Sequence, residues 1–135
     1  MEAQPEKSAV IGKLRAYFLA REEVMVACVH GSFTGGGRYN DIDVALLLSR
    51  APESALDYEL EIETALSLLR AYPREVDVRL LNGAPVAFQY GVIKNNIMLF
   101  VRDEDAYADF KEVVIRRYLG FKHHRDQLLK EMFQL

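Results

Sequence analysis

The stretch of sequence that decides the fold, residues 24–48, reads VMVACVHGSFTGGGRYNDIDVALLL. Its first part, Val24 to Val29, is a short apolar run rich in β-branched residues, which predicts a buried strand. The strand ends at His30-Gly31-Ser32, and the three adjacent glycines at 35–37 predict a loop. The segment from Asp41 to Leu48 is again apolar after its first acidic residues and predicts a second strand.

The spacing of apolar residues outside this stretch predicts helices and two further strands. The second helix is expected to present Leu56, Leu60, Ile62, Leu66 and Leu69 at helical spacing. The expected helices are 5–21, 53–72, 85–94 and 105–133, the last interrupted or bent near Gly120, and the further strands are 75–81 and 97–101. This alternation predicts an α/β (α+β) fold in a single domain, 1–135, with helices flanking one sheet of about four strands.

Composition narrows the class of protein. The chain has 135 residues, half of them apolar, and a formal net charge of −3, which gives no global argument for nucleic-acid binding. Its only cysteine, Cys28, excludes an intramolecular disulfide. The N-terminal residues have no apolar signal sequence, and no apolar run is long enough to span a membrane, so we expect a cytoplasmic protein without membrane contact.

Two carboxylates in the second strand are the main chemical signal. Asp41 and Asp43 are two residues apart and therefore project from the same face of the strand, roughly 7 Å apart, while Ile42 projects from the other face. Two acidic groups side by side in an apolar strand repel each other and are costly to desolvate. A hard cation such as Mg²⁺ relieves that repulsion.

The third strand adds another carboxylate, and the first strand ends in a phosphate-binding pattern. If the second and third strands are neighbours, Asp77 lies beside the aspartate pair, and three carboxylates suit two metal ions. Asp77 is also a candidate to accept a proton. Gly31 allows close approach of the backbone to a phosphate, the Ser32 hydroxyl can hold it, and Arg38 at the end of the loop can add positive charge.

The Gly-Ser pair, the Asp-x-Asp pair and the third Asp together resemble the nucleotidyltransferase fold of the DNA polymerase β superfamily. The small size resembles the minimal nucleotidyltransferases (MNT), and the segment FQYGVIKNNIMLFVRD, residues 88–103, resembles the helix-turn-strand that follows the third carboxylate. One departure is the eight-residue loop between Ser32 and Asp41, where about ten residues are common.

The resemblance implies a small mixed sheet and a specific activity. Asp41, Asp43 and Asp77 would hold two Mg²⁺ ions, and Gly31 and Ser32 would hold the triphosphate of ATP. A hydroxyl would attack the α-phosphorus with loss of pyrophosphate. Many MNT proteins are antitoxins of HEPN-domain toxins, and members add AMP to a tyrosine of that partner, so a HEPN toxin is the partner implied here.

Two other functions stay open from the sequence. The acceptor could instead be a small molecule of the aminoglycoside type, or the chain could neutralise a toxin by binding alone. The C-terminal helix, residues 105–133, is a candidate partner-binding element, because its apolar set is long for so small a domain and it also carries basic residues. An oligomer is also compatible with this helix. His30 and Cys28 are interpreted as structural.

Overall fold

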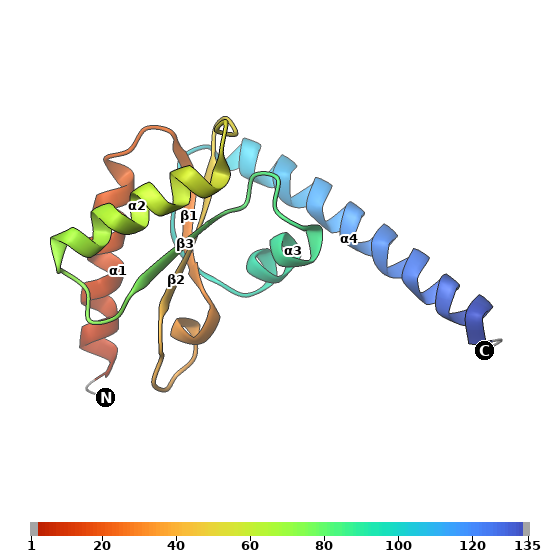
Figure 1. Cartoon of the computed structure of the whole chain (residues 1–135), viewed down its shortest axis with the longest axis horizontal. Helices are drawn as coiled ribbons and strands as arrows, with labels where there is room; N and C mark the ends of the chain where they lie inside the picture. The colour runs from red at the N-terminus through yellow and green to blue at the C-terminus, as the bar shows by residue number, and fades with distance from the viewer. Residues whose placement is uncertain (1–2, 134–135) are drawn as a thin grey trace.

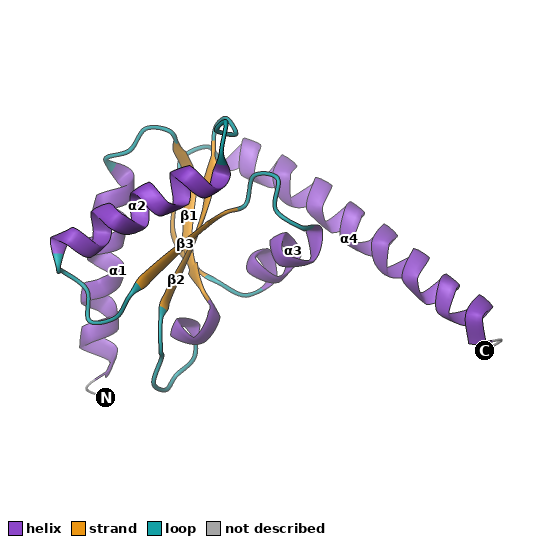
Figure 2. Cartoon of the chain, viewed as in Figure 1, coloured by secondary structure: helices purple, strands orange, loops and turns teal. Residues whose placement is uncertain are grey.

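The computed structural model describes residues 3–133, which form one four-stranded sheet with helices on both faces (Figures 1 and 2). The strands are β1 (Val24–His30), β2 (Ile42–Leu48), β3 (Val76–Leu80) and β4 (Ile97–Val101). The helices are α1 (Ala3–Leu19), α2 (Ala55–Leu69), α3 (Val86–Lys94) and α4 (Glu104–Phe133), and a single 3₁₀ turn, η1 (Gly31–Thr34), follows β1. The predicted fold class and elements are therefore confirmed.

The sheet is mixed, with the strand order β3-β2-β1-β4. Strand β1 pairs antiparallel with β2 and with β4, whereas β2 and β3 run parallel, and α2 provides the crossover connection that a parallel pair requires. The parallel pair is in register from Ile42 opposite Val76 to Leu46 opposite Leu80. The condition for bringing Asp77 beside the aspartate pair, that the second and third strands are neighbours, is met.

The two faces of the sheet carry separate cores. Helices α1 and α2 cover one face, where Leu14, Phe18, Ile62 and Leu66 pack on the inward residues of the strands. Helices α3 and α4 cover part of the opposite face, with Val92 and Tyr107 packed on a smaller set. The remainder of that second face, at the end of the sheet where β1 stops and β2 starts, is where Asp43 and Asp77 project.

One expectation about the helices is confirmed and one is wrong. The expected second helix is α2, in which Ile62 and Leu66 are buried, whereas Leu56, Leu60 and Leu69 are at least half exposed. The expected interruption or bend near Gly120 is not found. Helix α4 runs without interruption through Gly120. A helical glycine costs only about 1 kcal/mol relative to alanine, and the strong helix formers around it outweigh that cost.

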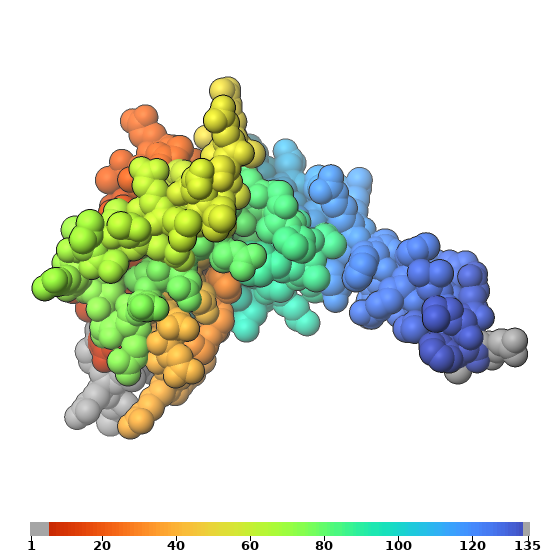
Figure 3. All heavy atoms as spheres, in the orientation of Figure 1, coloured from red at the N-terminus to blue at the C-terminus, as the bar shows by residue number. Residues whose placement is uncertain are grey.

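Helix α4 extends well beyond the rest of the molecule (Figures 1 and 3). Its first half packs on the body through Tyr107 and Val114, and Tyr118 stacks on Tyr90 of α3 with ring centroids 3.9 Å apart. Every residue from Leu119 to Phe133 is exposed. No helix within residues 3–133 is both long enough and apolar enough to cross a membrane.

Candidate active site

The centre of the site is a pair of carboxylates on neighbouring strands. Asp43 of β2 and Asp77 of β3 occupy the same register position in the parallel pair, so their side chains project side by side from one face of the sheet. Ile42 and Val78 project from the other face into the main core. The apolar residues on that face fix the register, because a slip of either strand by one residue would turn the carboxylate of that strand toward the core.

The pKa of Asp43 reflects the crowding of the three carboxylates. Desolvation by burial, followed by the negative charges of Asp77 and Asp41, raises the pKa of the Asp43 carboxyl above its ordinary value. Asp41 lies one residue before β2, which starts where the Ile42 N–H donates to the Glu75 carbonyl oxygen at 2.9 Å. The three predicted carboxylates therefore lie near one another. Asp43 and Asp77 are register partners on neighbouring strands, and Asp41 precedes Asp43 by two residues.

A divalent cation fits this chemistry in part. Carboxylates so close together that the charges of Asp77 and Asp41 help to raise the pKa of Asp43 are the kind of donor set that binds a hard cation. Among the described residues, however, no group of three or more His, Cys, Asp or Glu side chains is arranged so that it could hold a metal ion. Mg²⁺ commonly uses only one or two carboxylates and takes its other ligands from water and phosphate. Metal ligation by Asp41, Asp43 and Asp77 stays a prediction.

Gly31 fits closely against the carboxylate pair. Its φ of +74° is in the left-handed region that favours glycine, and it turns the chain from β1 into η1. A Cβ atom at this position would collide with Oδ2 of Asp43. The residue after it, Ser32, is exposed in the 3₁₀ turn. Gly31 and Asp43 thus lie against each other, and phosphate binding by Gly31 and Ser32 stays a prediction.

Side chains of α1 anchor the segment that contains the Gly31-Ser32 turn. The Lys7 ammonium donates to the carbonyl oxygens of Phe33, at 3.2 Å, and of Gly35. Phe33 is fully buried and packs edge-on against Tyr39, whose hydroxyl donates to Glu6 at 2.6 Å. These contacts fix both ends of the glycine-rich loop. Because the loop is short and anchored at both ends, the Gly31-Ser32 turn has a defined position.

One wall of the site is formed by side chains that sequence analysis did not assign to it. His30 is the register partner of Asp43 on β1 and packs edge-on against Phe88 of α3, with ring centroids 5.5 Å apart. The Arg79 guanidinium lies over the same Phe88 ring, 4.9 Å from its centroid. Burial, and then the charge of Arg79, lowers the pKa of His30. Arg79 follows Asp77 by two residues, so strand alternation alone could have placed it on this face.

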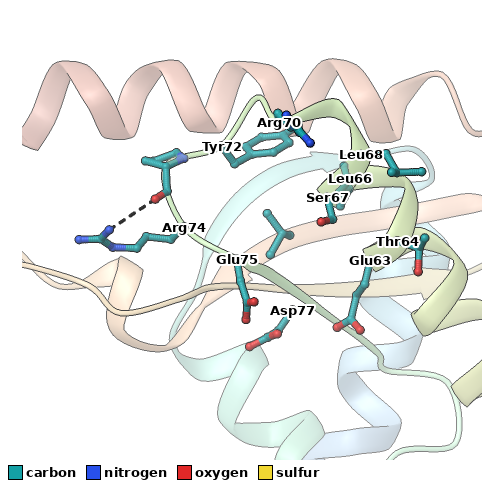
Figure 4. A pocket seen from close by; sticks show the side chains of 12 residues that line it. Glu63, Thr64, Leu66, Ser67, Leu68, Arg70, Tyr72, Arg74, Glu75 and Asp77 are labelled. Atoms are coloured by element: carbon teal, nitrogen blue, oxygen red, sulfur yellow. Dashed lines mark hydrogen bonds between the residues drawn. The ribbon is translucent and has the colours of Figure 1, made fainter.

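On the other side of Asp77 lies an open cavity of about 630 Å³ between α2 and the edge strand β3. Figure 4 shows Glu63, Glu75 and Asp77 with their carboxylates gathered at one end of it and Arg70 and Tyr72 at the other. The Glu63 carboxylate is held in place, because it accepts a hydrogen bond from the Val78 N–H at 2.7 Å. The site therefore has room for a second reactant next to Asp77.

The other residues singled out from the sequence have simpler surroundings. Arg38 is exposed in the loop, and its role in binding phosphate stays a prediction. Cys28 is buried, and desolvation raises the pKa of its thiol to about 12, consistent with an inert core residue. In the candidate partner-binding helix α4, which carries basic residues, His123 and His124 are exposed.

A small mixed sheet that presents paired carboxylates beside a Gly-Ser turn defines the palm of a nucleotidyl-transferring enzyme. The family model described as "Polymerase beta, Nucleotidyltransferase" matches residues 12–105, and the chain belongs to this family. The matched segment contains every predicted site residue. No curated protein matches the sequence.

Solved structures with the same fold are toxin–antitoxin proteins. The chain is similar to a mutant of the toxin-antitoxin MntA-HpeT, with a TM-score of 0.73 and 18% identity over 90% of this chain and 96% of the other. It is also similar to a toxin-antitoxin with AMP-PNP (TM-score 0.66, 18% identity, 90% and 98% covered). A third is the tri-AMPylated Shewanella oneidensis HEPN toxin in complex with MNT antitoxin (TM-score 0.62, 16% identity, 90% and 98% covered).

Proposed function

We propose that this protein is a Mg²⁺-dependent adenylyltransferase that transfers AMP from ATP to a hydroxyl, in particular a tyrosine hydroxyl, of a HEPN-domain toxin and thereby acts as its antitoxin. The observation that carries the proposal is the register pair of Asp43 and Asp77 directly beside the Gly31-Ser32 turn. The similar toxin-antitoxin structures support the choice of nucleotide and partner, since one includes AMP-PNP and another an AMPylated HEPN toxin. The proposed setting is the cytoplasm, where a thiol such as Cys28 stays reduced.

The reaction follows from the order of groups across the sheet. The Gly31-Ser32 turn would hold the triphosphate end of ATP, and Asp43, with Asp41 and Asp77, would hold Mg²⁺ beside it. Bound Mg²⁺ would neutralise charge on the phosphates and lower the barrier to attack. The acceptor enters from the cavity next to Asp77, which takes the proton of its hydroxyl. The acceptor oxygen then bonds to the α-phosphorus, the bond to the bridging oxygen breaks, and pyrophosphate leaves.

The second part of the proposal is that α4 holds the partner. Helix α4 packs on the rest of the domain through one stripe of residues at seven- and four-residue spacing, namely Tyr107, Val114 and Tyr118. The same stripe continues past the body through Phe121, Leu128 and Met132, which are 50%, 44% and 70% exposed. We call these three residues the free stripe. A helical face that continues a packed one and is itself uncovered fits a helix-in-groove partner.

The charge around the free stripe indicates what kind of partner it suits. Five basic residues and two acidic ones lie between Ile115 and Phe133, although the whole chain has a net charge of −3. Arg125 lies on the stripe itself, so a second copy packed antiparallel about this point would bring two arginines together. A toxin surface with an apolar groove and acidic rim is the better complement.

The activity is tested with ATP labelled at the α-phosphate, Mg²⁺ and a purified HEPN-domain toxin. Label should pass to the toxin with the wild type and fall at least 100-fold with Asp77→Asn or with Asp41→Asn and Asp43→Asn together. Glu61→Gln, an exposed acidic residue of α2, is the matched control and should transfer normally. Transfer that is unaffected by the aspartate changes would refute the proposal.

The same variants separate catalysis from simple covering of the toxin. If the Asp41→Asn and Asp43→Asn double variant still neutralises the toxin fully in cells, binding alone explains protection. The free stripe is tested by Phe121→Glu with Met132→Glu, which should abolish co-purification of the toxin, against Gln127→Glu on the opposite side of α4. Toxin binding that survives the double change would show that the partner docks elsewhere.

A further inference from the structure

A second cavity lies on the other side of the Gly31-Ser32 turn, between the end of β1 and α3. It measures about 250 Å³ and is lined by His30, Gly31, Ala87, Phe88, Gly91, Val92 and Asn95. Because Gly31 lines this cavity and also belongs to the turn beside Asp43, the cavity borders the proposed triphosphate site. It lies away from the larger cavity beside β3, which the proposed reaction gives to the acceptor.

The lining of this cavity suits a flat ring. Ala87, Gly91 and Asn95 follow one another at four-residue spacing along and just past α3, so they share one side of the helix. The first two have almost no side chain, and a Cβ built on Gly91 would meet no atom within 4 Å. The result is a smooth, open helix surface with an amide, Asn95, at its end.

His30 supplies a polar group whose hydrogen bonding is incomplete. Its Nε2 atom is buried and has no hydrogen-bond partner among the described residues. A buried polar atom without a partner costs free energy comparable to a lost hydrogen bond, so such an atom in a site calls for an explanation. A ligand that enters the cavity and brings a hydrogen-bonding edge would provide one.

We propose that this cavity binds the base of the nucleoside triphosphate, and that the base is a purine read by Asn95 and His30. An asparagine amide can pair with the adjacent donor and acceptor of adenine, N6 and N7, through two hydrogen bonds. The cavity is large enough for one planar ring system and too small for a peptide segment. This inference rests on the proposed function, because it assumes that the triphosphate lies at Gly31-Ser32.

The test compares binding of ATP with binding of inorganic tripolyphosphate, both with Mg²⁺, by calorimetry. Gly91→Leu places a side chain in the cavity and also raises helix propensity, so the protein should fold. It should weaken ATP binding about tenfold or more, the loss expected when base stacking is removed, and leave tripolyphosphate binding within twofold. Gly120→Leu is the matched control, since Gly120 is also helical and open, and should change neither.

A second variant keeps the test independent of Gly91. Asn95→Ala should reduce the preference for ATP over GTP by about tenfold. ATP binding of wild-type strength in Gly91→Leu, or an unchanged base preference in Asn95→Ala, would overturn the inference, and so would equal weakening of ATP and tripolyphosphate. If the wild type binds tripolyphosphate but ATP no more tightly, the base site fails while the triphosphate site stands; if it binds neither, the proposed function itself fails.

Discussion

The Glu63 carboxylate of α2 accepts a hydrogen bond at 2.7 Å from the backbone N–H of Val78, the residue next to the proposed catalytic Asp77. One turn earlier, Glu59 accepts from the N–H of Leu80 at 2.8 Å. The spacing of the two glutamates along α2 matches the spacing of the two N–H groups along β3, because four helical residues rise about 6 Å and two strand residues about 6.6 Å. The outer edge of β3 is thereby closed by side chains, and Asp77 is held in line with Asp43.

Removing this support should therefore affect both stability and catalysis. We expect Glu63→Ala to lower the free energy of unfolding by about 1.5–3 kcal/mol, the range for a hydrogen bond to a charged group. Transfer should fall with it, because β3 loses an anchor one residue from Asp77. Urea unfolding and the labelled-AMP assay measure the two effects. Glu61→Ala, on an exposed side of the same helix, should be neutral in both; equal losses would show that the edge contact is unimportant.

The raised pKa of Asp43 leads to a prediction about stability and pH. Because the folded-state pKa lies above the ordinary value of 3.8, the ionised carboxylate destabilises the folded protein, and this cost is complete above the folded-state pKa. Asp43→Asn should therefore raise the Tm at pH 7, by about 2 °C because solvent screens this half-exposed group. The advantage should shrink as the pH falls and vanish below 3.8.

The same variant tests the cation. Mg²⁺ with ATP should raise the Tm of the wild type, since binding to the folded state stabilises it, and should leave Asp43→Asn nearly unchanged. Thermal scans at several pH values with and without Mg²⁺ measure both effects. An Asp43→Asn protein that is less stable than the wild type at pH 7 would contradict the repulsion described here.

Gly31 gives a sharper test of the site's geometry. Gly31→Ala must strain a left-handed φ and push its Cβ into Oδ2 of Asp43, so the turn or the carboxylate has to move. We expect nucleotide affinity to fall more than tenfold, since either movement disturbs the triphosphate site. Calorimetry with ATP measures it. Gly36→Ala, where a Cβ meets nothing within 4 Å, is the control, and similar losses in both variants would mean that the loop as a whole is sensitive.

The sequence predicted those parts of the site that depend on local patterns. Alternation along β2 and β3 placed Asp43 and Asp77 on one face, and the glycine after an apolar run marked the turn. It did not predict Glu63 or Lys7, because their partners are 15 and 26 residues away and a charged residue on an amphipathic helix looks the same whether or not it is bonded. Helical spacing predicted α2 but could not show which of its apolar residues are covered: Ile62 and Leu66 are buried, whereas the three leucines Leu56, Leu60 and Leu69 are at least half exposed.

Lys7 carries the last prediction, because it connects α1 to the phosphate-binding turn. Its ammonium bonds the carbonyl oxygens of Phe33 and Gly35 and lies 5.3 and 5.4 Å from the ring centroids of Phe33 and Tyr39. Lys7→Ala should release the far end of η1, so we expect the KM for ATP to rise about tenfold with a smaller change in kcat, the sign of weakened ground-state binding. Lys13→Ala removes a comparable bond from the same helix, to the Ala71 carbonyl oxygen at 3.1 Å, far from the turn. If the two variants raise the KM equally, Lys7 acts through the stability of α1 and not through the turn.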